Sequence, residues 1–388
     1  MGIFLKSFMK ELFDLPNDIT YLNIAAQSPI FNSIYEAGIE GLQQKLHPHT
    51  IGISDYFEPV KELKLQFAKL IGASDYNRIA NIPSVSYGMA SVANNIRLDK
   101  GSEIIVVDEQ FPSNIYSWHR LAERCNAKIV TISAPDTKIN RVQKWNEEIL
   151  NAINENTGLV AMGHIHWSNG ALFNLKAIRK KTKENNALLV IDGSQTIGAF
   201  PFSVSEIEPD ALICAGYKWL FGPYGCAYGY YGSYFDNGIP IEENWSNRFN
   251  SENFAGLTAY ETGYKPLANR YAAGEGGSFI YVKMQNAALK GVLQWQPEQI
   301  QEHCKRISEE TISKLREKGC YIDDDNQRTH HLFGIKLPEG KNIELIKSAL
   351  NQHKIYVSYR GDYIRISSHI YNTKDEFDKF YDVISPLI

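Results

Sequence analysis

A lysine lies among aromatic residues and tight turns in the segment ALICAGYKWLFGPYGCAYGYYG, residues 211–232. Lys218 follows an apolar run of strand length, stands between Tyr217 and Trp219, and precedes a glycine-rich turn. Desolvation by such neighbours lowers the pKa of an amine, which suits a nucleophile that forms a Schiff base. A lysine beside a tryptophan is also common on solvated surfaces, so the segment alone leaves both interpretations open.

An aspartate stands at the end of another apolar run, in ALLVIDGSQTIGAFP, residues 187–201. A carboxylate is a poor core residue, and Asp192 at this position is a good partner for a cationic ring nitrogen such as that of a pyridinium. The alternative role for Asp192 is a helix cap. Gln195, three residues further on, can donate a hydrogen bond to a phenolic oxygen.

Two serines, Ser84 and Ser86, stand at the start of an expected helix in RIANIPSVSYGMASVANNI, residues 78–96. Hydroxyl groups and free N–H groups at the start of a helix form an anion site that suits a phosphate. A simple N-cap is the other interpretation of these serines.

Short apolar runs recur between residues 60 and 232, and helix-like segments separate them. Their apolar residues are continuous rather than alternating, which is typical of strands covered on both faces in a mostly parallel sheet. The runs are EIIVVD (103–108), AKIVTIS (127–133), LVAMGHI (159–165), ALLVID (187–192), ALICAG (211–216) and AYGYY (227–231). Ligands bind outside the carboxyl ends of such strands, which is where Asp192 and Lys218 fall.

Helices are predicted over 60–71, with Pro59 near the start and Gly72 past the end, and over 142–153. The pattern changes after residue 265, where a long helical stretch precedes short strands and further helices. We therefore expect a large α/β domain over 21–265 and a smaller α+β domain over 266–388. We expect residues 1–20 to form an N-terminal segment that packs on the smaller domain.

Composition excludes several classes of protein. The 388 residues carry a formal net charge of −4 with 44% hydrophobic residues, which fits neither a nucleic-acid-binding nor a disordered chain. No apolar run is long enough for a membrane helix, and Lys6 disfavours myristoylation of Gly2. Five cysteines without a CxxC pair indicate no disulfide framework. We expect a cytoplasmic protein.

A metal site is not predicted. His164 and His166 would project from one face of a strand, but no third ligand of suitable spacing accompanies them.

The candidate residues occur in a recognisable order: phosphate site, aromatic segment, aspartate, and a lysine 26 residues after the aspartate. In this order the sequence resembles the class V aminotransferase family of fold-type-I pyridoxal-phosphate enzymes. VIDGSQTIGAFP resembles the strand end of that family, and GYKWLFGPYG resembles its lysine loop. The resemblance extends over nearly the whole chain through HIHWSNG (164–170), DEQFPSNIYSW (108–118) and IRISSHIYNTKDE (364–376).

The resemblance implies a mostly parallel seven-stranded sheet flanked by helices, a smaller α+β domain, and pyridoxal 5′-phosphate as cofactor. Lys218 would hold the cofactor as a Schiff base, the internal aldimine, and move the proton at the substrate's α-carbon. Asp192 would keep the pyridine nitrogen protonated. Gln195 would bond the phenolic oxygen, and Phe111 would stack on the ring. Phosphate-contacting positions match Ser84, Val85, Ser86 and Tyr217.

Substrate and partner contacts are also implied by the resemblance. Arg365 matches the arginine that clamps the substrate carboxylate in many members, and Arg360 is the competing candidate. A solvated strand end is the alternative for either arginine. Trp167 is expected beside the substrate. Ser278, in GEGGSF, falls where homodimeric relatives reach the partner's phosphate, so a homodimer is expected.

Departures from the subgroups bear on the reaction. Desulfurase-type members have a histidine before the lysine and a mobile cysteine ahead of the carboxylate-binding segment, whereas here Tyr217 precedes the lysine and SALNQHKIYVSYRG contains no cysteine. Kynureninase is similar in its Phe-Pro loop, its tryptophan and its Tyr-Lys pair, but Gln195 stands where that enzyme has a histidine. The nearest pattern is that of the isopenicillin-epimerase-like and lyase-like set.

We therefore predict an enzyme that acts on the α-amino group of a small amino acid, with transamination as the leading hypothesis. Lyase, epimerase or kynureninase-like hydrolase chemistry on the same cofactor is the alternative. A non-catalytic pyridoxal-phosphate-binding protein is the alternative of another class. The expected ligands are an amino acid and a keto acid, without a nucleic acid, metal or membrane partner.

Overall fold

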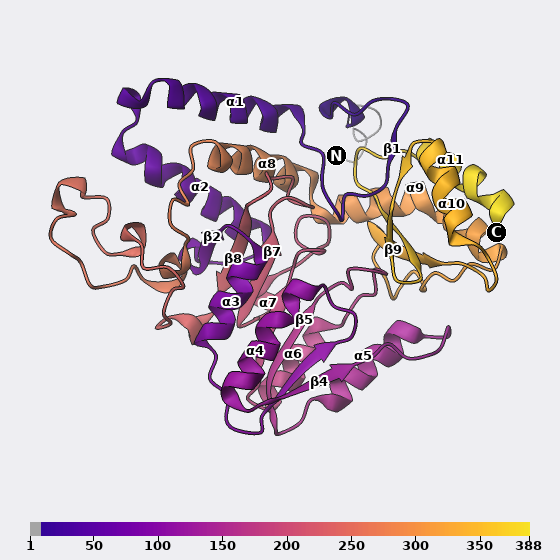
Figure 1. The fold of residues 1–388 in the computed structure, drawn as a ribbon, viewed down its shortest axis with the longest axis horizontal. Helices are drawn as coiled ribbons and strands as arrows, with labels where there is room; N and C mark the ends of the chain where they lie inside the picture. The colour runs from indigo at the N-terminus through magenta and orange to yellow at the C-terminus, as the bar shows by residue number, and fades with distance from the viewer. Residues whose placement is uncertain (1–8) are drawn as a thin grey trace.

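A seven-stranded sheet forms the centre of the computed structural model, which describes residues 9–388 (Figure 1). The strand order is β2-β8-β7-β6-β5-β3-β4, in which β3 to β7 are parallel and β8 is antiparallel to both neighbours. The strands are β2 (Ile79–Ile82), β3 (Glu103–Val107), β4 (Lys128–Ile132), β5 (Thr157–Gly163), β6 (Leu188–Asp192), β7 (Ala211–Ala215) and β8 (Ala227–Tyr231). The predicted fold class is confirmed, and every predicted run forms a strand; β2 is an addition.

Helices cover both faces of the sheet, as the continuous apolar runs predict (Figure 1). In β3, Ile105 belongs to the same apolar cluster as Trp145, whereas its neighbour Ile104 belongs to the cluster of Trp118 on the other face. The first cluster draws on α2 (Ile53–Leu70), α5 (Arg141–Ala152), α6 (Leu175–Glu184), α7 (Val204–Ile207) and α8 (Tyr281–Trp295). The second draws on α3 (Val85–Asn95) and α4 (Tyr116–Cys125).

Helix α2 starts earlier than its apolar spacing predicts. Gly52 is its N-cap residue and donates its N–H to the Asp55 carboxylate at 2.8 Å, so Pro59 lies inside the helix and not near its start. Proline lacks an N–H and removes one helical hydrogen bond. The predicted end is correct, because Gly72 follows the helix with a φ of +65°.

The C-terminal part is built around a three-stranded antiparallel sheet, β11-β12-β9, with its own apolar cluster. A capping box between Thr373 and Glu376 begins the last helix. The elements are α9 (Pro297–Glu317), β9 (Leu332–Lys336), α10 (Ile343–Gln352), β10 (Ile355–Tyr356), β11 (Ser358–Arg360), β12 (Tyr363–Ser367) and α11 (Lys374–Ile384).

Two connections bear on where the parts divide. Strand β1 (Thr20–Tyr21) pairs in parallel with β10, and α8 packs against α1 (Asn32–Leu46) and α2 (Figure 1). The predicted boundary near 265 stays a prediction, and the first eight residues of the predicted N-terminal segment lie outside the described residues. Among residues 9–388, no helix is both long and apolar enough to cross a membrane.

Candidate active site

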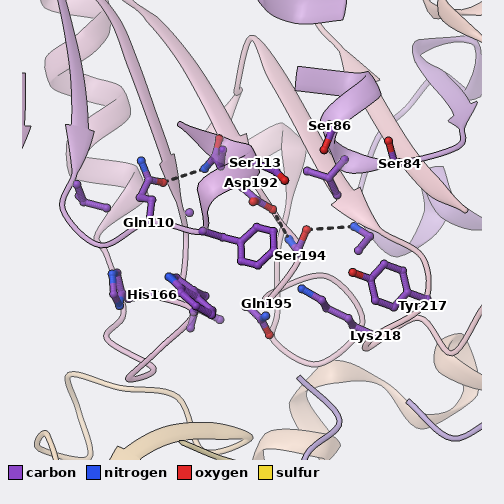
Figure 2. Close-up of a pocket in the computed structure, with 18 of the residues that line it drawn as sticks. Ser84, Ser86, Gln110, Ser113, His166, Asp192, Ser194, Gln195, Tyr217 and Lys218 are labelled. Carbon is purple, nitrogen blue, oxygen red and sulfur yellow. Dashed lines mark hydrogen bonds between the residues drawn. The ribbon is translucent and has the colours of Figure 1, made fainter. Parts of the chain in front are cut away.

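A pocket of about 220 Å³ opens where the parallel strands end, and it brings most of the predicted site residues together (Figure 2). Its walls come from the start of α3 and from the segments that follow β3, β5, β6 and β7. The predicted residues that line it are Ser84, Val85, Ser86, Phe111, Trp167, Asp192, Gln195, Tyr217 and Lys218. Sequence positions separated by more than a hundred residues thus form one cavity.

Lys218 is buried, with 8% of its surface exposed, and burial lowers the pKa of its amine to about 8. Asp192 acts in the opposite direction, whereas the charges of Arg365 and Arg360 lower this pKa further. The Nζ atom lies 5.5 Å from the centre of the Phe111 ring and 5.7 Å from that of Tyr217. The amine is therefore desolvated by aromatic rings, as a nucleophile that acts in its neutral form requires.

The turn that carries Lys218 is fixed by close packing. Gly198 has a φ of +99°, and a Cβ atom there would lie 2.5 Å from the carbonyl oxygen of Trp219. The Trp219 indole donates to Oε1 of Gln195 at 2.8 Å, and Nε2 of Gln195 donates to the carbonyl of Ala25 at 3.3 Å. Gln195 lines the pocket, and one of its two amide N–H groups has no acceptor among residues 9–388.

Asp192 is the last residue of β6, as the sequence predicts. Its Oδ1 atom accepts the N–H of Ser194 at 2.9 Å, and the Ser194 hydroxyl accepts the N–H of Ala215 at 3.1 Å. The carboxylate therefore stabilises a turn and lines the pocket, whereas no helix begins within the described residues 193–203 for it to cap (Figure 2).

The start of α3 forms another wall of the pocket. The Ser84 hydroxyl accepts the N–H of Tyr87 at 3.1 Å and is the N-cap, which is the alternative role foreseen for it. The first-turn N–H groups of Val85 and Ser86 have no intrahelical acceptor, and the helix dipole favours an anion beside them. This end of the cavity suits a phosphate.

Phe111 and Trp167 form a further part of the pocket lining. Their ring centres are 5.3 Å apart in an edge contact, and the Trp167 indole donates to the carbonyl of Glu109 at 2.6 Å. Phe111 remains 42% exposed. The Phe111 ring lies beside the Lys218 amine, and Trp167 packs against Phe111.

The predicted arginines do not line the cavity; they contact its wall from the C-terminal part. The Cζ atoms of Arg360 and Arg365 lie 5.2 Å and 5.8 Å from the centre of the Trp167 ring. Gly170, with a φ of +81°, permits this approach, because a Cβ atom there would lie 2.2 Å from the carbonyl oxygen of Leu332 in β9. Ser278 lines a separate pocket that contains none of the residues around Lys218.

Several pocket residues lie inside the motifs read from the sequence but are not among the predicted site residues. The fragment DEQFPSN supplies Gln110, Ser113 and Asn114, and the lysine and aspartate segments supply Tyr224 and Ser194. Their position beside predicted residues is the signal that could have found them.

His166 also lines the pocket, and burial lowers its pKa to about 4. The expectation that His164 and His166 share one strand face is wrong, because β5 ends at Gly163. His164 contacts Phe200 and Phe202, whereas His166 bonds the carbonyl of Asp108 at 3.1 Å.

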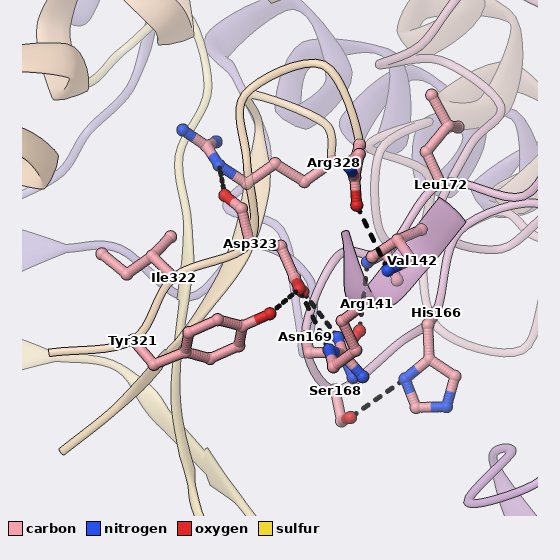
Figure 3. A network of polar contacts seen from close by, with 12 residues as sticks. Arg141, Val142, His166, Ser168, Asn169, Leu172, Tyr321, Ile322, Asp323 and Arg328 are labelled. Atoms are coloured by element: carbon pink, nitrogen blue, oxygen red, sulfur yellow. Dashed lines mark hydrogen bonds and ion pairs between the residues drawn. The ribbon is translucent and has the colours of Figure 1, made fainter. Parts of the chain in front are cut away.

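A buried ion pair joins α5 to the C-terminal part of the chain, near the segment that contains His166 (Figure 3). Arg141, the first residue of α5, donates to both carboxylate oxygens of Asp323, at 3.0 and 2.6 Å. The Tyr321 hydroxyl donates to the same carboxylate at 2.6 Å. This bidentate pair anchors the C-terminal part beside the segment that carries Trp167.

The mostly parallel sheet, with a buried lysine and a carboxylate at strand ends and a helix N-terminus beside them, is that of fold-type-I pyridoxal-phosphate-dependent enzymes. The family model for aminotransferase class V matches residues 20–380. The chain therefore belongs to the class V aminotransferase family, which confirms the resemblance, and pyridoxal 5′-phosphate as the cofactor of this family is confirmed with it.

Similar proteins have several activities. The chain is 24% identical to an uncharacterised aminotransferase, YcbU, of Bacillus subtilis. The matched region covers 97% of this chain and 96% of that protein. It is 20% identical to isopenicillin N epimerase of Streptomyces clavuligerus, with 95% of each chain covered. Among solved structures, a cysteine desulfurase of Thermococcus onnurineus NA1 superimposes with a TM-score of 0.82 at 20% identity over 98% and 97% of the chains. The cystine C–S lyase C-DES superimposes with a TM-score of 0.83 at 19% identity over 96% and 98%.

The residues present fit the cofactor. Lys218 is a buried cation that forms no ion pair within residues 9–388, which is costly for an amine that stays charged and suits one that forms an imine. The free N–H groups of α3 suit the phosphate, and Asp192 suits the ring nitrogen.

Proposed function

We propose that this protein is an aminotransferase that acts on the α-amino group of a small amino acid. The proposal rests mainly on one observation: the Lys218 amine is buried in the pocket, 5.5 Å from the centre of the Phe111 ring, and this burial lowers its pKa to about 8. The pKa of His166 lies far lower, at about 4, and burial raises that of Tyr217. A single base on one side of a substrate can move a proton between two carbons that flank the same nitrogen, as transamination requires.

Pyridoxal phosphate, when bound, supplies an aldehyde that condenses with amines and a ring that stabilises negative charge at the substrate's α-carbon. Ser84, Val85, Ser86 and Tyr217 would hold its phosphate. Asp192 would pair with its ring nitrogen, and the free amide N–H of Gln195 would donate to its phenolic oxygen.

Lys218 would take the proton from the substrate's α-carbon and would release it, on the same side, to the carbon across the amino nitrogen. Phe111 and Trp167 would exclude water from that proton, which keeps the amine weakly solvated and its pKa low. Arg365 would bind the substrate carboxylate, because its guanidinium has an unpartnered buried Nε atom beside Trp167.

A half-reaction tests the proposal. Purified holoenzyme is mixed with single amino acids in the absence of a keto acid, and the cofactor's absorbance and the released keto acid are followed. Transamination predicts about one keto acid per site, no free ammonia, and renewed turnover when a keto acid is added. Continuous release of ammonia would contradict it.

A C–S lyase is the second candidate, supported by the structural likeness to C-DES. In the same assay, a C–S lyase would release ammonia continuously, together with a sulfur-containing product. A desulfurase that uses a pocket cysteine is disfavoured, because none of the five cysteines lines the pocket. Epimerisation by two bases would need a second base in the pocket, but burial lowers the pKa of His166 and raises that of Tyr217. A non-catalytic protein would leave every amino acid unchanged.

A homodimer located in the cytoplasm is part of the proposal. Ser278 lies in a pocket apart from the Lys218 pocket, which fits a role toward the phosphate of a partner subunit. Gel filtration with light scattering tests this point, since a stable and active monomer would contradict it.

A further inference from the structure

Two arginines contact the same tryptophan at the edge of the candidate site. The Cζ atoms of Arg360 and Arg365 lie 5.2 and 5.8 Å from the centre of the Trp167 ring, so the two atoms are no more than about 11 Å apart. Trp167 lines the Lys218 pocket, and the charges of both arginines reach Lys218 strongly enough to lower its pKa. Both guanidinium groups therefore belong to the surroundings of this pocket.

Neither arginine has an acidic partner within residues 9–388. Arg360 donates to the carbonyl of Tyr359 at 2.7 Å, and Arg365 donates to the carbonyl of Trp167 at 2.9 Å and the Ser358 hydroxyl at 3.3 Å. The Nε atom of each is buried without a partner. Residues 1–8 contain no aspartate or glutamate, so they add no side-chain carboxylate. Arg365 is buried and Arg360 is partly buried, and guanidinium groups in such surroundings are stabilised when an anion binds.

Neutralising the charges of Arg360 and Arg365 requires more than one anionic group. Arg360 and Arg365 contribute two cations beside a pocket in which Asp192, assigned to the ring nitrogen of the cofactor, is the one lining carboxylate. The phosphate of the cofactor is assigned to the start of α3, on another wall. A substrate with a single carboxylate would leave one guanidinium without an anion.

We propose that the substrate is an amino acid with an acidic side chain, which binds Arg365 through its α-carboxylate and Arg360 through its side-chain carboxylate. This proposal rests on the proposed function, because it places the α-carbon beside Lys218. Arg365 is 1% exposed and held by two hydrogen bonds, which suits the invariant group of an amino acid. Arg360 is less buried, and its Nη2 atom has no acceptor among residues 9–388, which suits a side chain of variable length.

Non-reactive acids test binding without turnover. Calorimetric titration of the holoenzyme compares succinate with butyrate and glutarate with pentanoate, so that each pair has equal length and differs in one carboxylate. The wild type is expected to bind each diacid about tenfold or more tightly than its matched monoacid, as a charge-assisted hydrogen-bonded pair predicts. Arg360→Gln is expected to abolish this preference and to leave monoacid affinity unchanged.

The control is Lys336→Gln, which removes an exposed cation of β9 that pairs with Asp362 away from the pocket. It is expected to keep the diacid preference. Equal affinity of the wild type for diacid and monoacid would overturn the proposal without any variant, and so would an equal loss of both affinities in a folded Arg360→Gln. Since no step is catalysed, a failure of transamination in the keto-acid assay is distinguishable from a failure here.

Discussion

Two buried arginines of this protein are held in opposite ways. Arg141 is 6% exposed and forms a bidentate pair with Asp323, which is also bonded by Tyr321 (Figure 3). Arg365 is 1% exposed and donates to a carbonyl and a hydroxyl, with no carboxylate partner in residues 9–388. One guanidinium is paired within the chain and the other is not.

The pKa values show the consequence. Burial alone would lower the pKa of Arg141, but the hydrogen bonds and charge of Asp323 outweigh it and raise that pKa. Burial lowers the pKa of Arg365 to about 9, and the charge of Arg360 adds to the decrease. A buried charge that holds two parts of a fold together is expected to be paired, whereas an unpaired one indicates a place for a ligand. Lys218 resembles Arg365, because it too is buried without an ion pair within residues 9–388.

The largest effect is expected from Lys218→Ala, which removes the unpaired amine. We expect the turnover of any amino-acid substrate to fall by about a thousandfold or more, because general acid–base catalysis and covalent attachment are both lost. Thermal unfolding should shift little, since no ion pair is broken. The measurements are steady-state kinetics, and mass spectrometry after borohydride reduction, where a label retained on another lysine would contradict the assignment.

A change at the ion pair of Arg141 and Asp323 should instead affect stability more than activity. Asp323→Asn leaves the charge of Arg141 buried without its counter-ion, and we expect it to lower the free energy of unfolding by about 3–5 kcal/mol. Denaturant unfolding followed by circular dichroism measures this loss. Activity per folded molecule at low temperature should be largely retained.

A double variant separates pairing from packing. Arg141→Met combined with Asp323→Leu removes both charges from the same buried volume, and we expect it to recover most of the stability lost in Asp323→Asn. The double variant being no more stable than Asp323→Asn would mean that the hydrogen bond from Tyr321 and local packing, rather than the ion pair, dominate this region.

Arg365→Gln tests the unpaired arginine and should affect substrate binding more than stability. We expect KM for the amino-acid substrate to rise about ten- to a hundredfold, as loss of a charge-assisted hydrogen bond predicts. The free energy of unfolding should change by less than about 1 kcal/mol, because an uncompensated buried charge disappears together with two hydrogen bonds. A large loss of stability at unchanged KM would assign Arg365 to the fold, like Arg141.

The two regions also differ in what the sequence could predict. Lys218 and Asp192 each follow a continuous apolar run, and the ends of parallel strands meet at one edge of a sheet, so local patterns suffice to bring them together. Arg141 and Asp323 lie 182 residues apart, and neither stands in a pattern that indicates a partner. Pairing between distant elements depends on how the C-terminal part approaches the sheet, which no local signal encodes.

Side-chain direction shows the same limit. Arg365 and Arg360 were separable in the sequence only by resemblance, whereas the structure brings both to Trp167 through the close approach that Gly170 permits. The predicted common face of His164 and His166 failed because the end of β5 falls before them. Apolar runs give the existence of a strand more reliably than its last residue.

The smallest predicted effect is a pH dependence that only the unpaired region should show. Because burial lowers the pKa of Lys218 to about 8, the neutral, nucleophilic fraction of its amine rises about tenfold between pH 7 and 9. The rate at which apoprotein combines with pyridoxal phosphate should rise with the same midpoint, measured by stopped-flow absorbance. Asp192 raises this pKa, so Asp192→Asn should move the midpoint to lower pH. A midpoint near 10.5, the ordinary pKa of a lysine amine, would instead mean that the amine is solvated or paired, as the guanidinium of Arg141 is paired.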